Sequence, residues 1–118
     1  MKPKISFTID RSKWGKHTLM DVDGSMCAMG FLGKELGVPN KDLKNKGFPS
    51  LNQVKYWGKT GLFKCKDGNA LPDLTKQCRI SSINDVGPHN KRKEEKLINY
   101  FKKIGIGLKF KGKLKHVD

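Results

Sequence analysis

Side chains able to perform acid–base or metal-assisted chemistry are sparse in this 118-residue sequence. A nuclease-like site would need carboxylates or imidazoles that the fold brings together. The raw material is four acids and one histidine: Asp10, Asp21, Asp23, Asp85 and His89. They form no paired-carboxylate motif of catalytic spacing, and no P-loop or dinucleotide-binding glycine pattern is present. The sequence therefore predicts a protein with no catalytic residues and no cofactor, and a small nuclease-like enzyme is the second alternative.

Metal and thiol chemistry has equally little support. Cys27, Cys65 and Cys78 share no C-x-x-C spacing, and no histidine lies at a ligand spacing from them. Residues 21–24 resemble the start of a calcium loop, but the glycine comes early and position 12 would be Leu32 instead of a glutamate. We expect no metal site and no disulfide framework, so a reducing cytoplasm is the default compartment.

Positive charge dominates the composition. The sequence has 25 Lys and Arg against 11 Asp and Glu, a formal net charge of +14. Such a balance favours nucleic acid, an acidic protein surface or anionic lipid as a partner. Only Arg11, Arg79 and Arg92 are arginines. An AT-rich genome produces this lysine bias without selection on function, so the lysine excess reflects either function or codon usage.

Lys91, Arg92 and Lys93 fall in the first turn of a predicted helix. The helix macrodipole places partial positive charge there, so three cations oppose it and should lower stability unless an anion lies nearby. Together with free backbone N–H groups they predict a phosphate site. The alternative is that the side chains extend into solvent and that Lys91 pairs with Glu95 one turn along the helix.

A row of lysines alternates with apolar residues near the C-terminus: Lys109, Lys111, Lys113 and Lys115. Successive side chains of a strand point to opposite faces, so these ammonium groups line one face. The pattern predicts a contact with a polyanion. Two alternatives remain: outward lysines protect an edge strand from pairing with another chain, or the segment is a frayed tail.

Aromatic and cationic residues interleave at residues 55–59. Tyr56 and Trp57 lie between Lys55 and Lys59, a composition typical of a base-stacking platform flanked by phosphate contacts. Loop aromatics are more often part of a satellite core, so base stacking and core packing both remain open here.

Hydrophobic periodicity predicts the main elements. Strands are expected at residues 4–9, 19–22 and 108–115, with a turn at 10–16 that folds Trp14 back onto the core. A buried helix over 25–36 would begin behind Ser25 as N-cap and end at Gly37. An amphipathic helix over 91–104 carries an apolar stripe. Between residues 40 and 88 glycines and prolines interrupt each candidate element, leaving a short helix at 50–57 and a brief strand or turn at 79–83.

These elements predict one α+β domain over residues 1–118, with a loop-rich segment at 40–88. Its small antiparallel or mixed sheet would include both terminal strands and be covered by two main helices, about 25–36 and 91–104. The predicted core joins both ends of the chain: Ile5, Phe7, Ile9, Met29, Leu32, Leu36, Leu97, Ile98, Phe101 and Phe110. The N-terminus lacks an apolar signal segment, and no apolar run is long enough to span a bilayer.

Three stretches resemble a group of small proteins encoded by phages and prophages. They are residues 7–14 (FTIDRSKW), 23–31 (DGSMCAMGF) and 83–85 (IND), with Gly105–Ile106 near the other end. The lysine content departs from that group, whose members are more acidic. The resemblance implies no activity. It implies a setting of small accessory proteins that bind host machinery or viral nucleic acid, in the cytoplasm of a host cell.

The leading prediction is thus a basic accessory protein that binds nucleic acid or a nucleoprotein complex through its Lys-rich C-terminal half. The first alternative is a protein-binding inhibitor of a host defence, of anti-CRISPR or anti-restriction type, or of a transcription complex. Partners would be nucleic acid or an acidic protein surface, with no membrane contact. The sequence does not indicate an oligomeric state.

Overall fold

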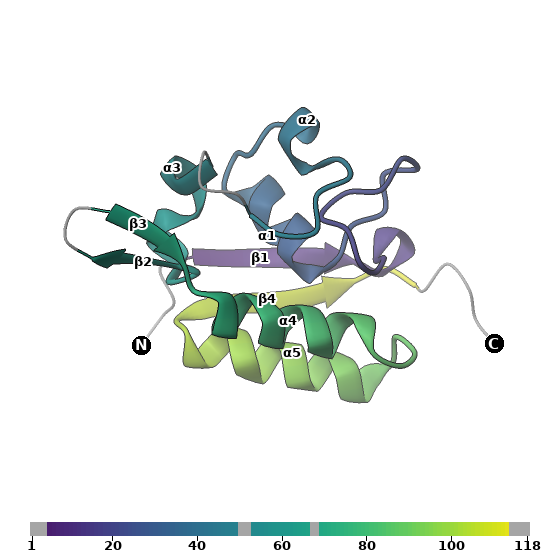
Figure 1. Ribbon diagram of the computed structural model, residues 1–118. Helices are drawn as coiled ribbons and strands as arrows, with labels where there is room; N and C mark the ends of the chain where they lie inside the picture. Colours follow the sequence, from purple (N-terminus) through teal and green to yellow (C-terminus); the bar gives the residue numbers. More distant parts are fainter. Residues whose placement is uncertain (1–4, 50–52, 67–68, 114–118) are drawn as a thin grey trace.

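The first and last strands pair in parallel. The computed structural model describes residues 5–49, 53–66 and 69–113 (Figure 1). In it, β1 (Ile5–Asp10) lies beside β4 (Ile106–Lys111), from Ile5 opposite Ile106 to Asp10 opposite Lys111. The prediction that both strands share a sheet is confirmed, but the predicted antiparallel or mixed sheet is wrong. No tight turn joins these strands, so nothing forces them to be antiparallel. Instead β4 follows directly from α5 (Lys91–Lys103), which sets its direction.

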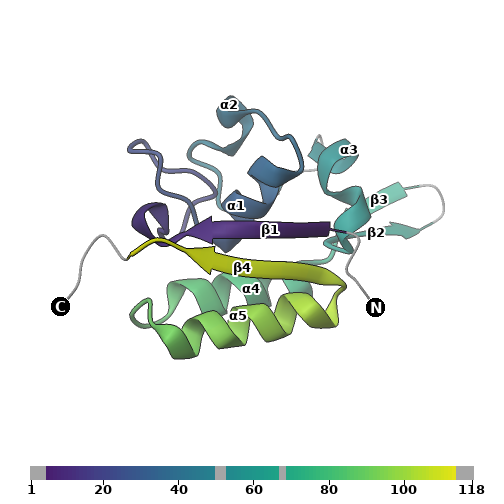
Figure 2. The ribbon, with the colours of Figure 1, turned by 180° about the vertical axis from the view of Figure 1, so that it is seen from behind.

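Three longer helices lie on one side of this sheet. α1 (Ala28–Glu35) packs against β1, α5 packs against β4, and α4 (Leu74–Asp85) packs against α1 and α5. Viewed from behind, no helix of the described residues lies in front of the two strands, so the other face of the sheet is left uncovered by helices (Figure 2). The predicted cover of two helices is therefore wrong, because a third helix completes the helical layer.

α4 occupies residues for which sequence patterns predicted loops and a brief strand or turn at 79–83. Its start is well defined, since the side chain of Asp73 accepts a hydrogen bond from the backbone N–H of Lys76 at 3.2 Å. Its inward positions are Gln77, Ile80 and Asn84. Two of the three are polar, so the helix lacks the apolar stripe by which an amphipathic helix is normally found.

The segment between α1 and α4 contains short elements. They are α2 (Asn40–Leu43), α3 (Val54–Trp57), the 3-10 turn η3 (Gly58–Thr60), and an antiparallel pair of β2 (Phe63–Lys66) and β3 (Asn69–Pro72). The helix predicted at 50–57 is present as α3, and residues 50–52 lie outside the described part of the chain. The strand predicted at 19–22 is wrong: this stretch makes one isolated bridge, between Met20 and Lys44.

The core joins both chain ends to α1 as predicted. Phe7 of β1 and Phe101 of α5 meet edge to face, with ring centroids 5.1 Å apart and an interplanar angle of 79°. All ten predicted core residues are confirmed, with Ile5, Leu36, Ile98 and Phe110 at its partly buried rim. After β1 the chain makes the 3-10 turn η1 (Arg11–Lys13), and Trp14 folds back onto the core, as expected.

α1 begins three residues later than predicted. Its N-cap is Cys27 and not Ser25, and Cys27 makes no side-chain capping bond. Gly37 follows the helix at φ +93°, consistent with its predicted role as the residue that ends it. Within the helix, Gly30 lies against the backbone of Leu19, where a Cβ would come within 2.7 Å of the carbonyl carbon.

No helix in the described residues is long and apolar enough to cross a membrane.

Candidate polyanion-binding surfaces

The fold separates the two groups of cations that the sequence suggested as one binding region. Phe7 contacts Phe101 of α5, so the apolar side chains of β1 and β4 face the helices. Ile106 and Leu108 are buried on that side, whereas Lys109 and Lys111 alternate with them and are exposed. The lysines of β4 therefore lie on the open face of the sheet, opposite to the face that packs against α5.

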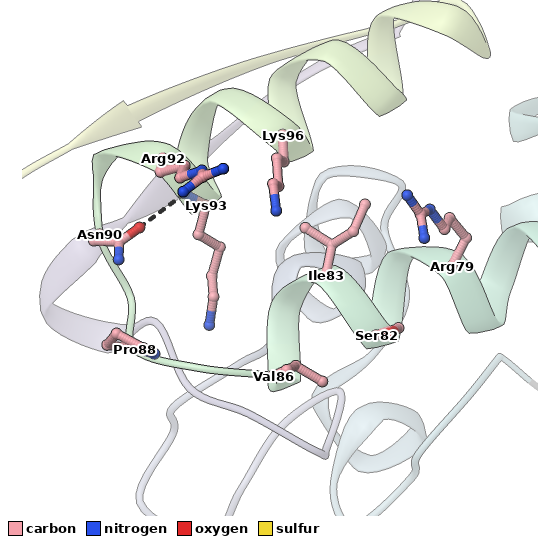
Figure 3. Close-up of a pocket in the computed structure, with 9 residues that line it drawn as sticks. All are labelled: Arg79, Ser82, Ile83, Val86, Pro88, Asn90, Arg92, Lys93 and Lys96. Atoms are coloured by element: carbon pink, nitrogen blue, oxygen red, sulfur yellow. Dashed lines mark hydrogen bonds between the residues drawn. The ribbon is translucent and has the colours of Figure 1, made fainter.

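A pocket of about 400 Å³ lies between α4 and α5. We call it the α4–α5 groove and define it by its lining residues: Arg79, Ser82, Ile83, Val86, Pro88, Asn90, Arg92, Lys93 and Lys96. Figure 3 shows the side chains of Lys96 and Arg79 extending from the facing helices into the space between them, on either side of Ile83. Arg92 and Lys96 are one turn apart on α5, a rise of about 6 Å.

The groove has a strongly cationic lining. Arg79, Arg92 and Lys96 are exposed, and no acidic residue of the described chain lines the groove. None of the ion pairs found within the described residues involves these three side chains. Cations held near one another without a carboxylate repel one another, and an anion between them would relieve that repulsion.

Lys93 plays a different part from its two neighbours in the first turn of α5. Its side chain is buried, with 5% exposed, and its ammonium donates three hydrogen bonds. The acceptors are the carbonyl oxygens of Asn84 at 2.8 Å and Gly87 at 2.7 Å, and Nδ1 of His89 at 3.2 Å. An ammonium has three protons, so Lys93 caps the end of α4 and has no donor left for a ligand. Burial and the nearby Lys16 ammonium lower the pKa of Lys93 to about 8.

Lys91 is exposed on α5 but does not line the groove. The start of the helix is capped by Asn90, whose side-chain oxygen accepts from the backbone N–H of Lys93 at 2.9 Å. Glu94 forms a bidentate pair with Arg11, with both N–O distances 2.8 Å. Of the three cations predicted at this helix start, Arg92 and Lys93 line the groove, and Arg92 alone has donors that are not used within the protein.

His89 belongs to the same buried polar cluster as Lys93. Its ring stacks on the indole of Trp14, with centroids 3.7 Å apart and an interplanar angle of 2°. Nε2 lies 3.2 Å from the carbonyl oxygen of Gly15. Because that oxygen can only accept, Nε2 carries the proton and Nδ1 accepts from Lys93. Burial and the charges of Lys93 and Lys16 lower the pKa of His89 to about 4, so the ring is neutral near pH 7.

The open face of the β1–β4 sheet carries the second basic surface. Lys109 and Lys111 are exposed on it and Lys113 is exposed just beyond β4, while Lys115 lies outside the described residues. Ser6 and Thr8 of β1 are exposed beside Gly107 and Lys109, their partners in register. We call this the sheet-face surface. The acidic residues of the sheet-face surface are Asp10, which lies opposite Lys111 in the strand pairing, and Glu35, at the end of α1.

The aromatic pair that suggested base stacking lies in α3. Trp57 is fully buried, and its Nε1 donates to the side-chain oxygen of Gln53 at 2.9 Å. Tyr56 is half-buried and packs against the core, with the Lys55 ammonium 5.1 Å from its ring centroid. Trp57 therefore belongs to the core, and Tyr56 remains the one member of the pair with an accessible ring.

Two of the candidate catalytic acids, Asp10 and Asp85, accept hydrogen bonds from elsewhere in the chain. Asp10 accepts from the backbone N–H and hydroxyl of Ser12, which lower its pKa. Asp85 accepts from the backbone N–H of His17 at 2.9 Å and lies 3.5 Å from its ring. Among the residues that the structure describes, no three His, Cys, Asp or Glu side chains gather as a metal site. Burial raises the pKa of the Cys27 thiol to about 11, which makes it a poor nucleophile.

Sequence reasoning missed two of the cationic residues that line the α4–α5 groove, Arg79 and Lys96. Lys96 is four residues after Arg92, so the two side chains share one face of the helix. This spacing is visible in the sequence and could have identified Lys96 as a second cation of the same surface. Arg79 was placed in a strand or turn, and no local pattern indicated that it would face α5.

Comparison of the chain with protein-family models, curated proteins and solved structures finds no match.

Proposed function

We propose that this chain is a non-enzymatic accessory protein of phage type that binds the phosphate backbone of nucleic acid through the α4–α5 groove. The observation that carries the proposal is the convergence of Arg79, Arg92 and Lys96 on one pocket with no acid among its described lining residues. Guanidinium and ammonium groups bind phosphate oxygens through charge-assisted hydrogen bonds, and they do so on any base sequence. The net charge of +14 supports the same class of partner.

A salt titration tests this proposal. We would measure binding of a labelled duplex of about 24 base pairs, and of a single strand of equal length, by fluorescence anisotropy at several salt concentrations. The logarithm of the affinity should fall linearly with the logarithm of the salt concentration. The triple variant Arg79→Gln, Arg92→Gln, Lys96→Gln should reduce the slope by about 0.7–0.9 for each phosphate that the protein no longer neutralises.

A matched control variant distinguishes specific binding at the groove from the general attraction of a basic protein for a polyanion. Lys41, Lys44 and Lys46 are exposed and remote in sequence from the groove. Changing all three to Gln removes the same net charge, so both triple variants have the same overall attraction for a polyanion. The groove variant should bind much more weakly than the control. Equal weakening in the two variants would mean that the groove is not a site.

A protein partner is the second candidate, and one observation favours it. Val86, at one end of the groove, is 71% exposed, and Leu74, at the first turn of α4, is 62% exposed. Protein interfaces use such apolar side chains as buried anchors, with charges at the rim. A protein target would be retained after nuclease digestion and in about half-molar salt, where backbone contacts to nucleic acid fail. Val86→Ser should weaken that binding and leave binding to the duplex unchanged.

A further inference from the structure

The two basic surfaces lie on opposite sides of the molecule. The α4–α5 groove is formed by the helical layer, and the sheet-face surface lies on the side of β1 and β4 that no helix of the described chain covers (Figures 1 and 2). The apolar layer between them contains Phe7, Leu97 and Phe101, all buried. No single flat surface can contact both sets of cations.

The sheet-face surface has the chemistry of a backbone contact. Lys109, Lys111 and Lys113 are exposed, and no ion pair within the described residues involves them. The hydroxyls of Ser6 and Thr8 lie on the same face and can donate to phosphate oxygens. No aromatic ring is exposed among the described residues of this face, so it suits a backbone more than unstacked bases.

A short duplex is too stiff to reach both surfaces. About 24 base pairs extend over roughly 80 Å, a small fraction of the persistence length of about 150 base pairs. Bending such a rod around the protein would cost several kcal/mol or more. Two separate duplexes can each occupy one surface without bending.

We propose that one protein molecule holds two nucleic-acid segments at once, one in the α4–α5 groove and one on the sheet-face surface, so that it bridges them. This inference rests on the proposed function, because the first segment occupies the groove described above. It adds a second site of the same chemical class and makes the protein a bridging protein instead of a simple backbone binder.

Energy transfer between two duplexes tests bridging directly. Duplexes of about 24 base pairs labelled with a donor dye are mixed with acceptor-labelled duplexes at limiting protein and low salt. Bridging should give energy transfer that a chase with excess unlabelled duplex abolishes. The variant Lys109→Gln, Lys111→Gln, Lys113→Gln should lose most of the transfer while still binding one duplex in the anisotropy assay. The control at Lys41, Lys44 and Lys46 should keep it.

The outcomes separate the two proposals. Binding of a single duplex without energy transfer would overturn bridging and leave the proposed function standing. An equal loss of transfer in the control variant would overturn bridging, since net charge alone would then explain it. Sedimentation that finds two protein copies in the bridged particle would also overturn it. No binding of duplex or single strand at low salt would overturn both proposals.

Discussion

The side-chain oxygen of Asn84 accepts hydrogen bonds from the indole Nε1 of Trp14, at 2.7 Å, and from the backbone N–H of Ala28, at 3.0 Å. A side chain from α4 thus caps α1, whose own N-cap residue makes no capping bond. The amide nitrogen of Asn84 also donates to the carbonyl oxygen of Gly15 at 3.0 Å. One buried amide therefore holds α4, the start of α1 and the turn after β1 together.

Asn84→Ala should destabilise the protein by about 3 kcal/mol or more. The substitution leaves the indole N–H of Trp14 and the backbone N–H of Ala28 without partners, and each unpaired buried group costs about 1–3 kcal/mol. Urea unfolding followed by circular dichroism measures the loss. Asn99→Ala, at an exposed position on α5, is the control and should change the free energy of unfolding by less than about 0.5 kcal/mol. A similar small change for Asn84→Ala would mean that this amide does not organise the helix ends.

Lys93→Met and Lys91→Met make the same chemical change two residues apart and should give opposite results. Lys93→Met leaves the carbonyl oxygen of Asn84 without its donor, whereas that of Gly87 still accepts from the Lys16 ammonium at 2.6 Å, so we expect a loss of about 1–3 kcal/mol. Lys91→Met removes an exposed cation that opposes the macrodipole and should be neutral or slightly stabilising. Thermal and urea unfolding of the two variants check this. Equal stabilities would show that the Lys93 ammonium is not a cap.

Stability should fall in acid as His89 becomes protonated. The pKa of His89 is lowered to about 4 in the folded protein, from 6.5, first by burial and then by the charge of Lys93. The unfolded chain therefore binds the proton first, so the contribution of His89 is complete above about pH 6.5 and is lost as the pH falls toward 4. The ring is only half-buried and solvent screens part of the effect, so we expect a loss of about 1–2 kcal/mol.

The His89 contribution can be isolated from the carboxylates that titrate in the same range. His89→Gln has no imidazole, so its stability should fall less steeply than that of the wild type between about pH 6.5 and 4. Urea unfolding across this range gives both curves. Parallel curves would mean that His89 titrates normally in the folded protein.

Gly30→Ala should be severely destabilising or prevent folding. The added Cβ would overlap the carbonyl group of Leu19, which is backbone and cannot rotate away. Gly47→Ala is the matched control, since its Cβ would have no neighbour closer than 3.9 Å. Soluble yield and melting temperature distinguish the two. A Gly30→Ala protein that melts like the wild type would show that α1 does not lie against this backbone.

The parts of the fold that could be predicted are those whose burial follows a simple period. Ile5, Phe7 and Ile9 alternate as a half-buried strand must, and Leu97 with Phe101 marks the inner face of α5. α4 could not be predicted in this way, because Gln77 and Asn84 are inward and make hydrogen bonds there. The parallel direction of β1 and β4 depends on how α5 packs, which no short pattern contains.

The residues of the candidate site could be predicted only where a short sequence pattern contains them. Arg92 could be named as a candidate from the sequence because cations in a first helical turn break a local rule. Lys93 was grouped with it, although it lies four residues before Leu97 and eight before Phe101 and therefore shares the buried face of α5. That spacing was readable from the sequence. The hydrogen-bond partners of Lys93 could not be predicted from the sequence. They include carbonyl groups at the end of α4, a helix that has no apolar stripe by which it could be found.

The pairing of β1 with β4 has a consequence for biosynthesis. β1 is made first, yet its hydrogen-bonding partner is residues 106–111, so Phe7 and Ile9 have no strand beside them while the intervening residues are translated. Such a long sequence separation raises the contact order and slows folding. The core can close only after β4 has left the ribosome, and until then the nascent chain exposes an apolar strand that chaperones can bind.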